Sequence, residues 1–108
     1  MAYGDVLVAL ADPTRRRVFE AVRQGPAAVG ELALGLPVTR PAVSQHLKVL
    51  ERAGLVSARP AGNRRIYSIR PEGLAELRGY LEGLWTDVLG AYGNEIARRA
   101  HDEREENP

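Results

Sequence analysis

Helix-capping residues, prolines and glycines divide the first 71 residues of this chain into short segments, and no other feature constrains the fold as strongly. Asp12 before Pro13 is a typical helix start, and Thr39 is suited to cap another helix, which Gly54 would end. Between these signals apolar residues recur every three or four positions, as on one face of a helix. The sequence therefore predicts short helices at residues 3–10, 13–23, 29–36 and 40–53.

The apolar positions of these helices predict which side of each one faces a core. We expect the following side chains to point inward: Tyr3, Val6, Leu7 and Leu10; Val18, Ala21 and Val22; Leu32, Ala33 and Leu36; and Val43, Leu47 and Leu50.

A β-hairpin is expected after the fourth helix. Residues 55–59 and 65–69 are strand candidates, and the segment 60–64 between them has the composition of a turn. Tyr67 and Ile69 share one face of the second strand, so we expect both to pack inward.

A long helix is expected from Pro71 onward, because leucine and valine recur there at heptad spacing over about two heptads. Glycines interrupt it, and the segment 90–93 is a predicted bend or break because each glycine costs about 1 kcal/mol against alanine. Residues 100–108 are polar and charged and predict a disordered tail. The predicted fold class is mainly α with a small β-hairpin: a domain at residues 1–99 followed by that tail.

Composition excludes several classes of function. The 108 residues include no cysteine, which rules out disulfides, thiolate metal sites and a cysteine nucleophile. No apolar run is long enough to span a membrane, and no signal peptide is recognisable, so we expect a cytoplasmic protein. No nucleophile–base pair or phosphate-binding loop is visible, and we predict that the chain is not an enzyme and needs no cofactor.

The positive charge of the chain is concentrated in its middle. Residues 40–70 hold seven basic residues against Glu51 alone, whereas residues 71–108 hold four against nine acidic ones. Two short helices followed by a hairpin with an arginine-rich tip form the order of a winged helix-turn-helix, whose second helix fits the major groove of DNA. The sequence therefore predicts double-stranded DNA as the partner.

The expected DNA-binding residues lie on the fourth helix and at the hairpin tip. On the helix they are Arg40, Pro41, Ser44, Gln45, His46, Lys48 and Arg52, and on the hairpin they are Asn63, Arg64 and Arg65. Arg15 and Arg16 are candidates for further phosphate contacts.

Three stretches resemble the ArsR/SmtB family of bacterial transcriptional regulators. Residues 10–17 (LADPTRRR) are similar to the opening of that family's second helix, residues 41–50 (PAVSQHLKVL) to its recognition helix, and residues 62–67 (GNRRIY) to its wing. The resemblance covers roughly residues 3–90. It implies a winged helix-turn-helix of about five to six helices, and a repressor that a signal releases from an inverted-repeat operator.

The resemblance also implies a homodimer formed through the first and last helices. The residues expected at that interface are Tyr3, Val6, Leu7, Leu10, Leu77, Leu81, Leu84, Trp85, Val88 and Tyr92. Trp85 and Tyr92 remain open to a second interpretation, in which they line an effector pocket.

The chain departs from the metal-sensing members of that family. Where some members carry cysteines, this sequence has Glu31-Leu32-Ala33-Leu34-Gly35, and the histidine that zinc sensors place two residues after an aspartate is missing after Asp87. We therefore expect no metal site, and the inducing signal stays open. The sequence does not decide between repression and activation, and a protein-interaction module that uses the last helix is the alternative function.

Overall fold

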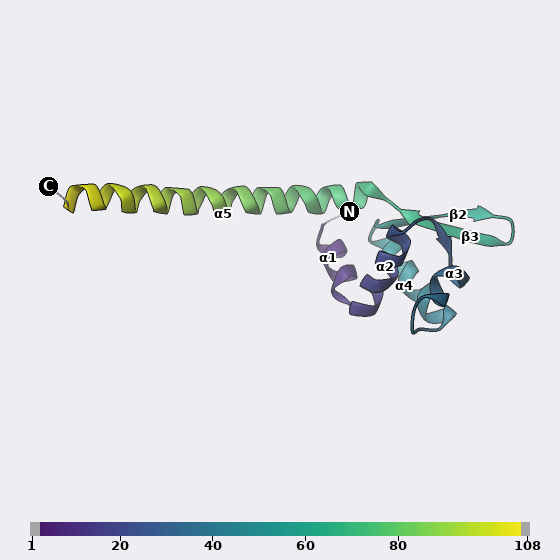
Figure 1. Ribbon diagram of the computed structural model, residues 1–108. Coiled ribbons are helices and arrows are strands. Elements are labelled where there is room, and N and C mark those ends of the chain that lie inside the picture. The colour runs from purple at the N-terminus through teal and green to yellow at the C-terminus, as the bar shows by residue number, and fades with distance from the viewer. Residues whose placement is uncertain (1–2, 107–108) are drawn as a thin grey trace. The chain divides into compact units, whose positions relative to one another are not determined.

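In a computed structural model, which describes residues 3–106, four short helices precede a hairpin and a long helix (Figure 1). The helices are α1 (Tyr3–Ala11), α2 (Pro13–Arg23), α3 (Val29–Leu34), α4 (Arg40–Arg52) and α5 (Pro71–Glu106). Residues up to Leu77 form one compact unit, and residues from Arg78 onward form a second. The mainly helical fold class is confirmed, and the helix boundaries agree closely with those predicted from the sequence, apart from the shorter α3.

The helix boundaries follow from local hydrogen bonds. The carboxylate of Asp12 accepts a hydrogen bond from the backbone N–H of Arg15 at 2.8 Å, which caps the start of α2. Thr39 does the same for α4, since its hydroxyl oxygen accepts from the N–H of Ala42 at 3.3 Å. At the other end of α4, Gly54 has a φ of 80° in the left-handed region that favours glycine. The predicted end of α4 is therefore confirmed.

The sheet has one strand more than the sequence predicts. It is antiparallel with the order β1-β3-β2, formed by β1 (Ala27–Ala28), β2 (Val56–Ala61) and β3 (Arg64–Ile69). The expected five-residue turn at 60–64 is wrong, because only residues 62 and 63 lie between the strands. Gly62 has a φ of 64° and residue 63 has a negative φ, the pattern of a tight type II′ turn. Pro60 is tolerated inside β2 because β2 is an edge strand.

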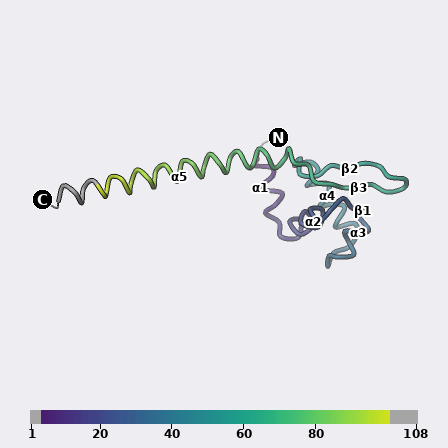
Figure 2. Tube along the Cα trace, turned by 45° about the horizontal axis from the view of Figure 1, so that its top comes forward, coloured from purple at the N-terminus to yellow at the C-terminus, as the bar shows by residue number. Residues whose placement is uncertain are grey.

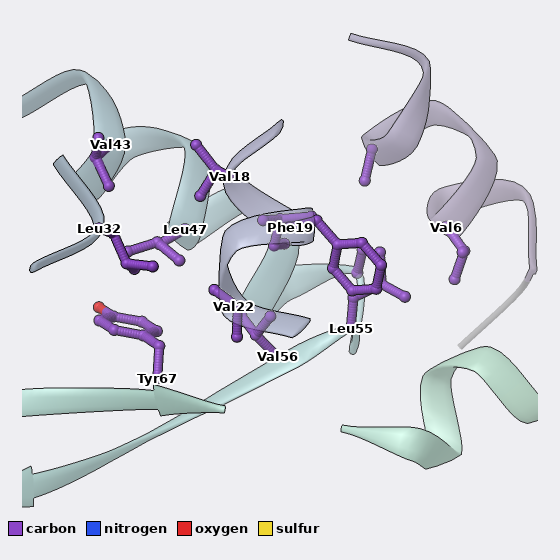
Figure 3. Close-up of a cluster of buried hydrophobic side chains, with 13 residues drawn as sticks. Val6, Val18, Phe19, Val22, Leu32, Val43, Leu47, Leu55, Val56 and Tyr67 are labelled. Atoms are coloured by element: carbon purple, nitrogen blue, oxygen red, sulfur yellow. The ribbon is translucent and has the colours of Figure 1, made fainter. Parts of the chain in front are cut away.

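One hydrophobic core joins the helices to the sheet (Figure 3). Figure 2 shows α2, α3 and α4 gathered on one side of the hairpin, and Figure 3 shows Tyr67 rising from β3 toward Leu32 of α3. Ile69 is half-buried and packs against this core, as predicted, and Ile66, three residues before it and outside the core cluster, is also buried. The buried cluster consists of Val6, Ala9, Val18, Phe19, Val22, Leu32, Val43, Leu47, Leu50, Ala53, Leu55, Val56 and Tyr67.

Helix α5 is continuous from Pro71 to Glu106. The expected bend or break at residues 90–93 is therefore wrong. The disordered tail at residues 100–108 stays a prediction. Glycine weakens a helix through backbone entropy but keeps its N–H donor, so the backbone hydrogen bonds can continue through it. Ion pairs one turn apart support the helix, including Arg78–Glu82 at 2.7 Å and Arg99–Glu95 at 3.0 Å.

Candidate nucleic-acid interface

Helix α4 exposes a polar row that its own spacing sets. Arg40, Ser44 and Lys48 follow one another at intervals of four residues and therefore lie along one side of the helix. The adjacent side carries Val43, Leu47 and Leu50, which are fully buried in the core. This burial fixes the rotation of α4 and places the polar row at the border of the core, with Arg40 and Lys48 exposed and Ser44 half-buried.

The hairpin presents a second polar group. Because the turn is only two residues long, Asn63 lies in the turn itself, and Arg64 and Arg65 begin β3 directly after it. All three side chains are exposed. The pairing of β2 with β3 through Ala61 and Arg64 runs up to the turn and holds these residues at the tip of the hairpin.

A groove of about 560 Å³ brings the two groups together. We call it the basic groove, because Arg40 and Lys48 line it from α4 and Arg64 and Arg65 line it from the hairpin. Its lining residues are Ala28, Val29, Gly30, Glu31, Leu34, Arg40, Ser44, Lys48, Asn63, Arg64, Arg65 and Tyr67. Six of the ten residues predicted to contact DNA thus share one surface.

The other four predicted residues lie outside the basic groove. Pro41 and Gln45 are exposed on α4, one row away from the groove, and His46 is half-buried. Arg52 lies at the far end of α4, where it lines a separate hollow of about 300 Å³ with Asp5 and neighbouring apolar residues.

The two arginines predicted to contact phosphate at the start of α2 differ. Arg15 is half-buried, and its Nη1 donates to the backbone carbonyl of Ala9 at 3.5 Å, in the last turn of α1. A cation near a helix C-terminus is stabilised by the helix dipole and by the free carbonyls there. The structure therefore gives Arg15 a role in joining α1 to α2, whereas Arg16 is exposed and remains a candidate for phosphate contact.

Six lining residues were not predicted as site residues, and two of these six have exposed side chains, Glu31 and Leu34. Glu31 of α3 forms an ion pair with Arg64 at 2.9 Å, and Leu34 is 86% exposed at the end of α3. Ala28 has no side-chain oxygen and so gives no capping-box signature with Glu31, and no sequence signal pointed to Glu31 or Leu34. An exposed leucine in a polar groove has the apolar surface that contacts a thymine methyl group or a sugar.

The residues predicted for a dimer interface divide into two sets. Val6 is 1% exposed, so the structure assigns it to the core of the protomer instead, and Leu10 and Leu77 pack partly against that core. The side chain of Tyr3 lies outside the described residues. The others expose large apolar surfaces, with Trp85 and Tyr92 each 64% exposed: Leu7, Leu81, Leu84, Trp85, Val88 and Tyr92.

The described part of the chain contains neither a metal-binding cluster nor a membrane-spanning helix. Among residues 4–100, whose side chains the structure describes, no group of three histidine, cysteine, aspartate or glutamate side chains is arranged to bind a metal ion. Across the same range, no helix combines the length and the apolar character needed to cross a lipid bilayer.

Comparison with known proteins identifies the family. A helix-turn-helix domain model matches residues 10–58. HTH-type transcriptional regulator Rv2034 of Mycobacterium tuberculosis is 56% identical over 94 residues, which cover 87% of this chain and 88% of that protein. HTH-type transcriptional repressor SmtB of the same species is 38% identical over 76 residues, 70% of this chain and 56% of SmtB. The chain belongs to the ArsR/SmtB family of transcriptional regulators.

Solved structures of ArsR-family proteins share the fold. One is the homodimeric winged helix-turn-helix DNA-binding domain (fragment 1–100) of Mb0332 from Mycobacterium bovis, a possible ArsR-family transcriptional regulator. It superposes with a TM-score of 0.62 at 30% identity, over 78% of this chain and 78% of that one. In this winged helix-turn-helix fold, α3 and α4 correspond to the helix-turn-helix and β2 with β3 to the wing.

Proposed function

We propose that this regulator is a homodimer that binds an inverted-repeat DNA operator through α4 and the wing, and that it represses transcription, with its own promoter as the first candidate target. The observation that carries the proposal is the basic groove, where four cations from two separate elements share one surface. Affinity for DNA comes mainly from cations that neutralise phosphates, and sequence is read by a helix in the major groove. A protein with this role acts at the chromosome, and we place it in the cytoplasm.

The roles of individual residues follow from their positions. Gln45, exposed on α4, is proposed to read adenine, and Arg40 to read guanine or hold a phosphate. Asn63, Arg64 and Arg65 are proposed to contact the backbone or the minor groove beside the site of α4. The repressor assignment draws on the name of the related SmtB protein, and the sign of regulation depends on where the operator lies.

The dimer proposal is supported by the exposed apolar side chains of α5. Leu84, Trp85 and Val88 each expose about half or more of their surface to solvent, which soluble chains avoid over a long contiguous stretch. A second copy of the chain would cover them, and a two-fold dimer matches an inverted repeat. Light scattering after size exclusion should give twice the mass of the chain. Leu84→Lys should give the monomer mass, whereas Arg78→Lys on the same helix should leave the dimer intact.

Fluorescence anisotropy tests DNA binding. The purified protein is titrated into labelled DNA from immediately upstream of its own gene, and into a shuffled duplex of equal composition, at two salt concentrations. Tight binding to the upstream duplex alone supports an autoregulatory role. Equal, salt-sensitive binding to both means that the operator lies elsewhere or that binding is non-specific. Absence of binding to either duplex at low salt would refute the proposal and favour a protein-interaction module built on α5.

A further inference from the structure

One carboxylate lies inside the basic groove. Glu31 Oε1, on α3, accepts a hydrogen bond from Arg64 Nη1 at 2.9 Å and joins the helix-turn-helix to the tip of the wing. Of the groove-lining residues, all within the described part of the chain, Glu31 alone is acidic. A negative charge in this place opposes the binding of a polyanion, so its presence needs an explanation other than attraction to DNA.

The ion pair is open to exchange. The side chains of Arg64 and Glu31 are 60% and 53% exposed, so solvent reaches both. Exposed pairs of this kind are weak, because water screens them and both side chains lose freedom when they pair. Arg64 can therefore leave Glu31 for another anion without any rearrangement of the buried core.

We propose that Glu31 is an internal competitor that occupies the wing arginine and lowers the affinity of the protein for DNA. This inference rests on the proposed function. A phosphate that binds Arg64 must displace the Glu31 carboxylate, and the freed carboxylate then lies near the phosphate and repels it. Where Arg64 contacts the phosphate backbone, which carries no sequence information, Glu31 weakens binding to every duplex alike. It thereby holds down the non-specific binding that would distribute the protein over the chromosome.

A substitution can remove the charge and keep the fold. The same Oε1 atom of Glu31 lies 3.4 Å from the backbone nitrogen of Ala28, which donates to it at the start of α3. Glu31→Gln retains an oxygen at that position and removes the negative charge. Glu20→Gln is the matched control, because Glu20 pairs with Arg23 on α2 at 2.6 Å and does not line the basic groove, yet its loss changes the net charge equally.

The test is an anisotropy titration of the full chain with the shuffled duplex over a range of salt concentrations. Glu31→Gln should bind about three- to tenfold more tightly than wild type, and Glu20→Gln by less than about twofold. The slope of log K against log salt should steepen by about 0.9, the value for one neutralised phosphate, because a Glu31 carboxylate no longer offsets the charge of Arg64 in the complex. When Arg64 is replaced by alanine, adding Glu31→Gln should raise the affinity for DNA much less than it does in the wild-type protein.

Each result separates the inference from the proposed function. Wild type that binds no duplex at low salt overturns the proposed function, and the inference with it. Wild type that binds DNA while Glu31→Gln binds equally or more weakly overturns the inference alone. So does an equal gain from Glu31→Gln in the wild-type and Arg64→Ala backgrounds, because Glu31 would then act through the general field and not through the wing arginine. Thermal melting confirms that each variant is folded.

Discussion

Gly73, in the first turn of α5, lies directly against the backbone of Gly54, at the end of α4. A Cβ atom added to Gly73 would lie 2.1 Å from the carbonyl oxygen of Gly54, closer than any real contact. Just before this point the N–H of Arg70 donates to the carbonyl of Leu55 at 2.8 Å. The start of the long helix is therefore fixed by backbone contact to the segment that links the recognition helix to the wing.

Gly73→Ala should destabilise the protein by about 1–3 kcal/mol, because the backbone of Gly54 cannot yield as a flexible side chain would. Gly79→Ala is the matched control on the same helix. Nothing lies within 4 Å of its added Cβ, so alanine should stabilise the protein by up to about 1 kcal/mol. Urea unfolding of both variants measures the difference, and equal stability of the two would contradict the close approach.

Arg15 and Arg16 should separate stability from DNA binding. Arg15→Ala removes the hydrogen bond to the Ala9 carbonyl and the packing of a half-buried side chain, so it should lower the free energy of unfolding by about 1 kcal/mol and leave DNA affinity unchanged. Arg16→Ala should weaken DNA binding and leave stability unchanged, because Arg16 is exposed. The reverse pattern in melting and anisotropy experiments would show that Arg15 is the phosphate contact.

The Thr39 cap should matter for the recognition helix. Thr39→Ala leaves the N–H of Ala42 without its acceptor and should cost about 1 kcal/mol of stability, with a frayed first turn that weakens the placement of Arg40. Thr39→Ser retains the hydroxyl and should behave as wild type. Thermal melting compares the three proteins. If alanine and serine are equally tolerated, the cap has no energetic role.

Gln45 and Arg65 should affect DNA binding in different ways. Gln45→Ala should reduce the difference in binding free energy between the upstream and the shuffled duplex by about 1–3 kcal/mol, the value for one bidentate base contact. Arg65→Ala should lower the affinity for both duplexes about equally, and should reduce the slope of log K against log salt concentration by about 1. Arg23→Ala, on α2 and outside the basic groove, controls for charge. If Gln45→Ala keeps the same preference for the upstream over the shuffled duplex, Gln45 does not read a base.

Local signals in the sequence were enough to predict most helix boundaries, because the side chains of Asp12 and Thr39 and the conformation of Gly54 act within a few residues. Strand β1 could not be predicted, since two alanines have no strand preference and become a strand only by pairing with Tyr67 and Ile66 of β3. The tight turn was missed because Pro60 resembles a turn residue, and only its place on an edge strand lets it pair.

The site was predictable where it depends on helix spacing and was not where it depends on tertiary contact. The row from Arg40 to Lys48 follows from the period of α4. The direction of Arg15 toward Ala9 and the pair between Glu31 and Arg64, 33 residues apart, depend on how the elements pack. No periodicity or composition contains that information.

Hydrogen–deuterium exchange with and without the upstream duplex tests directly whether α4 and the wing together form the DNA-binding surface. Exchange should slow on binding at residues 40–52 and around the turn between β2 and β3, with little change at residues 18–23 in the second half of α2. Protection confined to α5, with α4 and the wing unaffected by DNA, would contradict that assignment of the surface.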